Sequence, residues 1–195
     1  MKKQEIYIST DVESDGPCPG LNNMLSLGAA VTDPETEEVI SSWYGTFELL
    51  PDCSPHPDTM ENFWEKPENQ KAWEAARKNP RDPKILMEEF VIWVESFGGR
   101  PVFVNYPLAY DWKWIDYYLH RFIGRNPFGF SAALDIKSIV YGGRFCKSTT
   151  FKGVSKRYMP KRWFKNLPPH THIADEDAIE QSVLFHRIRK EIDSK

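Results

Sequence analysis

The chain has 195 residues, of which 41% are hydrophobic and 27% are charged, and its formal net charge is −3. This length is enough for one sizeable α/β domain and too short for two full ones, so we expect a single domain over residues 1–195. The net negative charge argues against a protein that binds nucleic acid over its whole surface. Any contact with nucleic acid is therefore expected to be local.

Two features of the composition concern location. No apolar run approaches the twenty residues of a membrane span, and the N-terminus lacks the apolar segment of a signal peptide, so no membrane contact is expected. The cysteines Cys18, Cys53 and Cys146 are odd in number and widely spaced, without a Cys-x-x-Cys motif. This usage favours a reducing, cytoplasmic environment over a disulfide framework or a zinc knuckle.

The first predicted strand begins at Ile6 and breaks at Gly16, and it carries its charge at its C-terminal end. Because side chains alternate along a strand, Asp11 and Glu13 point to the same side, about 7 Å apart. Two carboxylates held so close repel each other unless a cation lies between them, and hard oxygen ligands suit Mg²⁺ or Mn²⁺. The alternative is a solvated acidic strand end.

Two further strands are predicted over residues 24–32 and 39–49, and the short turns between them indicate an antiparallel meander. The proline-rich stretch 51–67 that follows contains Phe63 and Trp64. This pair either anchors a loop on the core or forms an aromatic lip against which a base stacks.

The middle of the chain alternates helices and strands. Helical patterns are predicted over residues 70–78 and from Pro83 to Gly98, with Asp82 as the N-cap, followed by a short buried strand over 101–105. A helix over residues 110–122 comes next, and Asp111 lies at its start, close to the end of the preceding strand. Ligands bind at such strand ends in open α/β sheets, although a helix-start Asp is also favoured by the macrodipole. The fold class predicted is α/β, with three antiparallel strands followed by parallel strands, flanked by helices.

Another short segment and helix are predicted over residues 129–141, where Asp135 is interpreted as a cap or as a partner of a ligand residue. The only basic tract spans residues 147–165 and interleaves cations with aromatic residues. Within it, Lys152, Lys156 and Arg157 are candidates for contact with substrate phosphates, and a solvated basic loop is the alternative.

The last predicted helix runs to about Glu191. On it, Asp177, Gln181, Leu184 and Ile188 form one stripe, so the same face that buries the apolar residues turns Asp177 toward the sheet. A buried acid needs a cation or a hydrogen-bond partner. His172 lies on the loop just before this helix.

Taken together, Asp11-x-Glu13, Tyr110-Asp111 and His172-x-Ala174-x-x-Asp177 resemble the three motifs of the DEDDh family of 3′–5′ exonucleases, from about residue 5 to residue 190. The resemblance implies a ribonuclease H-like fold and metal binding by Asp11, Glu13, Asp111 and Asp177, with His172 as general base. It also implies two Mg²⁺ or Mn²⁺ ions that activate water and stabilise the leaving 3′ oxygen. Homodimers occur in this family, so a homodimer is a further expectation.

The match departs from the family pattern in two places. The family often has an Asn four residues before the second Asp, whereas Asn105 lies six residues before Asp111, which puts a role for Asn105 in doubt. His170 and Asp175 repeat the spacing of His172 and Asp177. We choose the latter pair because it has the motif's alanine and because Asp177 lies on the buried stripe.

The sequence therefore predicts a metal-dependent 3′–5′ exonuclease that acts on the 3′ ends of single-stranded nucleic acid, with RNA preferred over DNA. A DNA exonuclease of proofreading type is the alternative within this class. A nucleic-acid-binding module without catalysis is the alternative outside it, and a hydrolase of small phosphodiesters or nucleotides is a third.

Overall fold

The computed structural model describes residues 4–194, which form a five-stranded sheet in the order β3-β2-β1-β4-β5. The strands are β1 (Glu5–Ser14), β2 (Met24–Thr32), β3 (Val39–Thr46), β4 (Arg100–Asn105) and β5 (Ala133–Asp135). β1 and β2 pair antiparallel, as do β2 and β3, whereas β1 with β4 and β4 with β5 pair parallel. This is the predicted mixed sheet, and the α/β class is confirmed.

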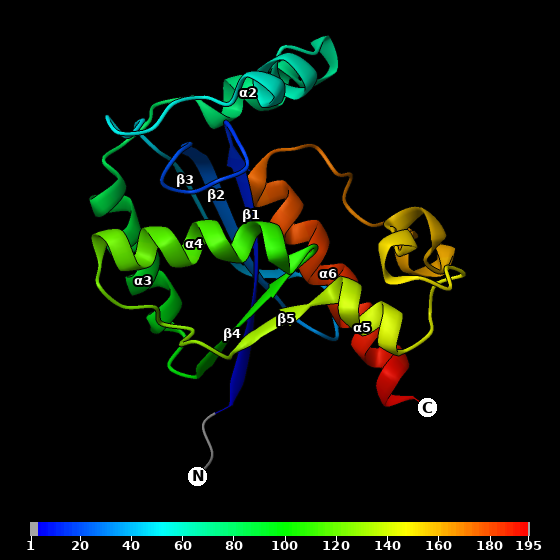
Figure 1. The fold of residues 1–195 in the computed structure, drawn as a ribbon. Coiled ribbons are helices and arrows are strands. Elements are labelled where there is room, and N and C mark those ends of the chain that lie inside the picture. The colour runs from blue at the N-terminus through cyan, green and yellow to red at the C-terminus, as the bar shows by residue number, and fades with distance from the viewer. Residues whose placement is uncertain (1–3, 195) are drawn as a thin grey trace.

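Helices cover both faces of this sheet (Figure 1), with α3 and α4 on one side and α6 on the other. The helices and helical turns are α1 (Pro57–Thr59), η1 (Met60–Trp64), η2 (Pro67–Asn69), α2 (Gln70–Ala76), α3 (Pro83–Ser96), α4 (Leu108–Phe122), α5 (Ile136–Gly142), η3 (Phe151–Gly153), η4 (Lys156–Tyr158), η5 (Lys161–Phe164) and α6 (Ala174–Asp193). As predicted, α3 begins after Asp82, whose side chain accepts hydrogen bonds from the Lys84 and Ile85 amides. No helix among residues 4–194 is long and apolar enough to cross a membrane.

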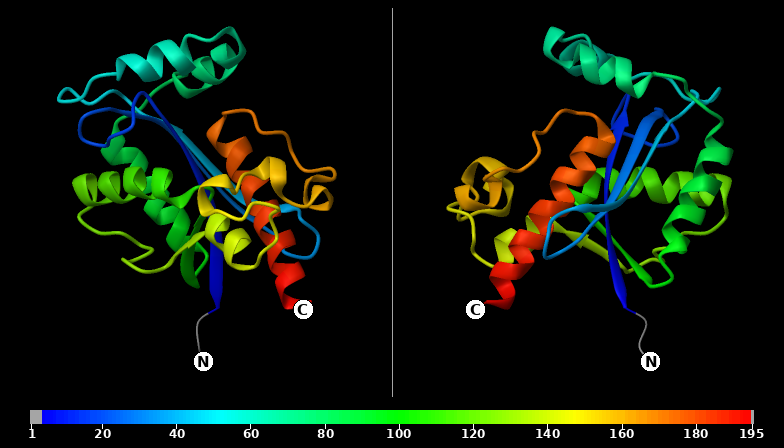
Figure 2. Two further views of the ribbon diagram at one scale, coloured as in Figure 1. Left: turned by 45° about the vertical axis from the view of Figure 1, so that its right-hand side comes forward. Right: turned by 180° about the vertical axis from the view of Figure 1, so that it is seen from behind.

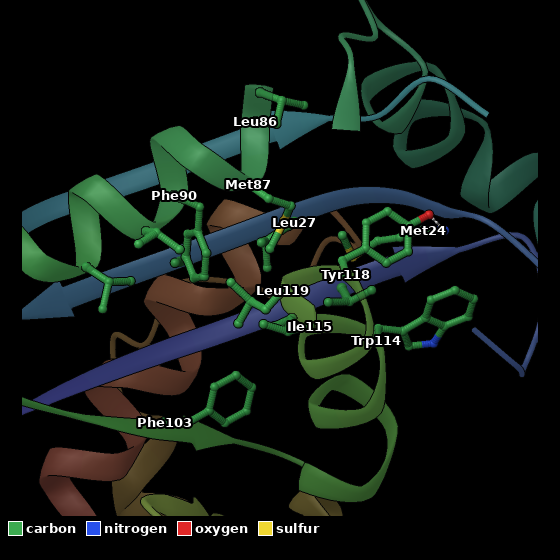
Figure 3. Packing of buried hydrophobic residues seen from close by; sticks show 14 of the residues in the cluster. Met24, Leu27, Leu86, Met87, Phe90, Phe103, Trp114, Ile115, Tyr118 and Leu119 are labelled. Carbon is green, nitrogen blue, oxygen red and sulfur yellow. Dashed lines mark hydrogen bonds between the residues drawn. The ribbon is translucent and has the colours of Figure 1, made fainter. Parts of the chain in front are cut away.

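The larger core lies between the sheet and the α3–α4 layer (Figure 3). Alternation along the strands sends Ile8, Val12 and Phe103 into this layer. Side chains from the two helices fill the space opposite, among them Leu86, Met87, Phe90, Trp114, Ile115, Tyr118 and Leu119. The Tyr118 hydroxyl accepts a hydrogen bond of 3.0 Å from the Met24 amide, so the buried phenol is satisfied and α4 is fastened to β2.

The opposite face of the sheet packs against α6, which crosses it from the acidic end of β1 toward the N-terminal end of that strand (Figure 2). Leu184, Phe185 and Ile188 of α6 are buried there with Val104 of β4. Gly28 makes the close approach possible, because a Cβ at this position would lie 2.1 Å from the Ala174 carbonyl carbon. Since Gly28 is the partner of Asp11 in the sheet, the start of α6 is placed beside the acidic end of β1.

Several elements differ from the sequence prediction. β3 ends at Thr46, and the next residue, Phe47, forms an isolated bridge with Arg81 while its amide still donates to the Leu25 carbonyl. The stretch over 51–67 contains three short helical turns, and the basic tract contains three more. The last helix begins at Ala174, three residues before Asp177. Asp135 is confirmed as a cap, since its side chain accepts from the Lys137 and Ser138 amides at the start of α5.

Candidate active site

Four acidic side chains from three elements meet at the C-terminal end of β1. Asp11 and Glu13 come from the strand, Asp111 from the first turn of α4, and Asp177 from the first turn of α6. Carboxylate oxygens of Asp11, Glu13 and Asp177 all lie within 4.8 Å of one another. Asp11, Glu13 and Asp111 line a cleft of about 330 Å³ whose other walls include Phe63, Tyr106, Tyr110, His170 and His172.

Hydrogen bonds from distant parts of the chain hold the carboxylates of Asp11 and Asp111. The Val12 amide donates to Oδ1 of Asp111 at 2.7 Å, which ties α4 to β1 beside Asp11. Gln181 donates from Nε2 to Oδ1 of Asp11 at 2.8 Å, and its Oε1 accepts from the Tyr106 amide at 2.8 Å. Gln181 therefore links α6, β1 and the chain after β4 through one buried amide.

Asp177 is fully buried and is held by the loop before its own helix. The Thr171 amide donates to Oδ1 at 2.8 Å, the His172 amide donates to Oδ2 at 2.9 Å, and Nδ1 of His170 lies 3.0 Å from Oδ2. Both oxygens are therefore oriented before any ligand arrives. The sequence prediction that Asp177 faces the sheet is confirmed, since Asp177, Gln181, Leu184 and Ile188 are all buried.

Charge in this cluster is poorly compensated by the protein itself. Burial, with the neighbouring carboxylates adding to it, raises the pKa values of Asp11 and Glu13 well above their ordinary range. Burial also raises the pKa of Asp111 to about 7, although its hydrogen bond from Val12 acts in the other direction. Burial acts to raise the pKa of Asp177 too, but the hydrogen bonds from His170 and the two loop amides outweigh it and lower that pKa overall.

The donor set fits a divalent cation. Glu13 is only 8% exposed, and no hydrogen bond reaches its carboxylate from residues 4–194. Every oxygen in the group is a hard carboxylate donor of the kind that Mg²⁺ and Mn²⁺ prefer. A cation placed among Asp11, Glu13 and Asp177 would offset the repulsion that, after burial, raises the pKa values of Asp11 and Glu13.

His172 lies at the wall of the same cleft in a left-handed backbone conformation, with φ of 58°. Its ring meets the edge of Phe63 with centroids 5.0 Å apart, and it is half-buried. Burial, together with the charge of His170, lowers the pKa of His172. The imidazole is therefore neutral near pH 7 and able to accept a proton.

The two aromatic residues after α1 differ in what they can do. Phe63 lines the cleft, but Trp64 is only 2% exposed and packs with Leu25 and Trp73 in a small separate core. Its indole Nε1 donates to the Ser14 carbonyl at 2.9 Å. The expectation of a stacking platform is therefore corrected for Trp64, because neither face of its ring is available to a base.

The three basic candidates for phosphate contact, Lys152, Lys156 and Arg157, differ in their position relative to the clefts. Lys156 and Arg157 line a second cleft with Tyr106, Pro107 and His170, and these last three also line the acidic cleft. Lys156 forms an ion pair with Glu180, whose side chain is only 3% exposed. Lys152 is exposed on η3 and lines neither of the two clefts.

Sequence reasoning missed several parts of this site. Asn105, whose role the spacing put in doubt, is fully buried, donates to the Thr10 carbonyl at 2.6 Å and acts to lower the pKa of Asp111. His170 was set aside with Asp175, yet it contacts Asp177, whereas Asp175 lines a different cavity with Tyr44. Only for Gln181 was a signal present, because a polar residue on a buried stripe requires a polar partner.

No family model matches the chain. It is 33% identical over 193 residues to the 3′–5′ DNA exonuclease Cap18 of Escherichia coli, with 96% of this chain and 93% of that protein covered. The chain belongs to the DEDDh family of 3′–5′ exonucleases. The resemblance seen in its three motifs is thereby confirmed.

Solved structures, an exonuclease among them, have the same fold. Exonuclease I of E. coli in complex with a dT13 oligonucleotide has a TM-score of 0.69 at 13% identity, with 98% of this chain and 43% of that chain covered. The Mg²⁺- and Mn²⁺-bound form of S. pombe Pop2p has a TM-score of 0.64 at 15% identity, with 97% of this chain and 85% of that chain covered. The chain thus spans less than half of exonuclease I and most of Pop2p, and the ribonuclease H-like fold is confirmed.

Proposed function

We propose that this family member is a divalent-metal-dependent enzyme that removes nucleotides from the 3′ end of single-stranded DNA. The observation that carries the proposal is a cleft lined by Asp11, Glu13, Asp111 and His172, with the buried Asp177 carboxylate within 4.8 Å of those of Asp11 and Glu13. A protein that only bound nucleic acid would have no reason to bury so many uncompensated acids, since confining them costs stability. The catalytically silent module therefore remains the weaker alternative.

The carboxylates are proposed to hold two Mg²⁺ or Mn²⁺ ions. Asp11, Glu13 and Asp177 would hold one, and Asp11 with Asp111 the other. Bound there, such ions supply an activated water and charge compensation for the leaving 3′ oxygen. The chain's own part is to orient the donors, which the Val12 amide does for Asp111 and Gln181 does for Asp11.

His172 is proposed to accept the proton of the attacking water. Its lowered pKa keeps the imidazole in the neutral form, and its edge-on contact with Phe63 limits rotation of the ring toward the cleft wall. The hydrogen bond from the His172 amide to Asp177 fixes the backbone that carries the base relative to a carboxylate of the metal site. The proposed base and a proposed metal-binding carboxylate are thereby held together across the start of α6.

Substrate contacts are proposed for the rims of the cleft. Phe63 offers an aromatic surface for the terminal base, and stacking of this kind tolerates any base. Lys156 and Arg157, in the adjoining cleft, would contact backbone phosphates upstream of the reacting bond. Lys152 lines neither cleft, so we propose that it contacts a part of the strand farther from the reacting bond.

DNA is proposed as the substrate because the E. coli relative is named a DNA exonuclease and because the exonuclease I structure contains a deoxythymidine oligonucleotide. The sequence alone favoured RNA, so the experiment below compares both nucleic acids. The homodimer and the cytoplasmic location stay predictions; light scattering on the purified chain tests the first.

The experiment that tests the proposal is a time course on 5′-labelled single-stranded DNA and RNA of identical sequence. Each strand is incubated with Mg²⁺, Mn²⁺ or EDTA, with the wild-type chain and with Asp11→Asn. We expect a ladder that shortens from the 3′ end of DNA, requires metal and is absent in the variant. A ladder on RNA alone would reverse the substrate assignment, and no cleavage of either strand with any metal would refute the enzyme.

A further inference from the structure

A second group of metal-ligating side chains lies at the edge of the acidic cleft. His170, His172 and Asp177 each present one donor atom, and the three atoms lie within 4.8 Å of one another. The two imidazole rings are 4.5 Å apart between centroids. The proposed nuclease mechanism uses His172 and Asp177 but gives His170 no task.

One distance within this group is close to that between two ligand atoms of a tetrahedral site. Nδ1 of His170 lies 3.0 Å from Oδ2 of Asp177. In a tetrahedral zinc site with bonds of about 2.0–2.1 Å, two ligand atoms are about 3.3 Å apart. A shift of a few tenths of an ångström would therefore let an ion replace the hydrogen that His170 and Asp177 share, while the displaced proton moves to Nε2 of His170.

The surroundings also meet the requirements of a built site. Asp177 is fully buried, and the Thr171 and His172 amides already orient its oxygens, as supporting hydrogen bonds do in protein metal sites. The side chain of His170 is 46% exposed, which leaves a path for an ion from solvent and room for a water as fourth ligand.

The chemistry of the donors selects the ion. Two imidazoles and one carboxylate suit Zn²⁺, whereas Mg²⁺ prefers oxygen ligands alone. We propose that His170, His172 and Asp177 form a Zn²⁺ site, which shares Asp177 with the neighbouring Asp11–Glu13–Asp177 carboxylates, and that its occupation switches the nuclease off. The proposed inhibition rests on the proposed function, because a bound Zn²⁺ would occupy both His172, the proposed base, and Asp177, a proposed ligand of the catalytic metals.

The site is tested first by binding alone. Zn²⁺ is titrated into the metal-free full chain in competition with a chromogenic chelator, and Co²⁺ absorption reports four-coordinate ligation. We expect one Zn²⁺ per chain, and at least about a tenfold weaker affinity in His170→Gln, since even indirect partners of a metal ligand contribute about 10–100-fold. His120→Gln is the matched control, because His120 is an exposed histidine that lies 3.4 Å from a single carboxylate, that of Asp116.

Asp11→Asn separates the two sites. It removes an acid from the carboxylate group and leaves the histidine group complete, so we expect Zn²⁺ affinity to be retained in it. Affinity lost in Asp11→Asn and kept in His170→Gln would place zinc on the carboxylates and overturn the proposal, as would the absence of Zn²⁺ binding by the wild-type chain.

Inhibition is measured second, by titrating Zn²⁺ into the Mg²⁺-supported cleavage of single-stranded DNA. We expect the half-inhibiting concentration to rise at least about tenfold in His170→Gln, in parallel with the loss of affinity. Equal inhibition of both chains would refute the switch. If neither chain cleaves DNA, the proposed function fails, while the binding result still decides whether the zinc site exists.

Discussion

Glu13 and Asp15 are two residues apart on the chain, and both are buried, but their carboxylates have opposite surroundings. Asp15 is 1% exposed and accepts hydrogen bonds from the amide and the side chain of Asn23, at 2.6 and 2.7 Å. Glu13 is 8% exposed, faces the acidic cleft and accepts no hydrogen bond from the described part of the chain. Carboxylate oxygens of two other acids, Asp11 and Asp177, lie within 4.8 Å of it.

The difference separates a structural acid from a candidate ligand. Asn23 also accepts from the Leu50 amide, so Asp15 belongs to a network that joins β1, β2 and the loop after β3. A satisfied network of this kind stabilises the fold. Glu13 instead weakens the metal-free fold through repulsion, which suggests that its lone pairs are kept for an exogenous cation. Five predictions test this division.

The largest effect is expected for Glu13→Gln, which keeps the shape of the side chain and removes its charge. Activity should fall by about 10³-fold or more, because metal ions contribute several kcal/mol to the transition state and each 1.36 kcal/mol is tenfold. Cleavage rates on single-stranded DNA measure this, and thermal melting in EDTA should show an unchanged or raised Tm. A variant with full activity would show that Glu13, like Asp15, is a structural acid and not a metal ligand.

His172→Ala is expected to lower kcat by about 10²–10⁴-fold, the usual contribution of a general base, with little change in the Kd for single-stranded DNA. The pH dependence of kcat should lose its acidic limb in the variant, since that limb reports protonation of the base. A variant that loses DNA binding and keeps kcat would show that His172 positions substrate.

The metal-free protein should lose stability as pH rises. The folded pKa of Asp111 is about 7 against an ordinary value of 3.8, so between these values the folded state binds more protons than the unfolded state. Stability therefore falls from about pH 4 to about pH 7, by an amount on the order of a few kcal/mol. Melting in EDTA across this range measures it, and Mg²⁺ should raise Tm more near pH 7 than near pH 5. A Tm that rises with pH in EDTA would contradict the uncompensated cluster.

Asp15→Ala should show the reverse pattern from Glu13→Gln. Removing the acceptor leaves the buried Asn23 amide unsatisfied, which costs about 1–3 kcal/mol of unfolding free energy. Denaturant unfolding measures this loss, while the cleavage rate per folded molecule should stay close to that of the wild-type chain. A selective loss of rate without a loss of stability would move Asp15 into the site.

The smallest effect is expected for Arg157→Ala. Removal of one phosphate contact should weaken DNA binding by a few-fold and reduce the salt dependence of binding by about one unit of slope. Lys152→Ala is the comparison variant and should have the smaller effect, because Lys152 carries the same charge on the same tract but lines neither cleft. Equal effects of the two variants would indicate that the whole tract attracts DNA without a defined contact.

Much of the fold follows from local patterns. The strand over 24–32, the capped helix after Asp82 and the stripe on α6 were all predicted, because alternation, capping and helical periodicity are properties of neighbouring residues. The three acidic motifs were also visible in their chain order. Boundaries were less accurate where a long-range contact decides them, as where Phe47 leaves β3 to pair with Arg81.

The sequence by itself determined the α/β class, the likeness to DEDDh exonucleases and the acids that converge at the end of β1. Only the tertiary structure decided that Trp64 is core, that the buried Asn105 donates to the Thr10 carbonyl, and that His170 reaches Asp177. The reason is physical: spacing along the chain shows which way a side chain points, whereas burial and hydrogen-bond satisfaction depend on partners up to 170 residues away, as for Gln181 and Asp11.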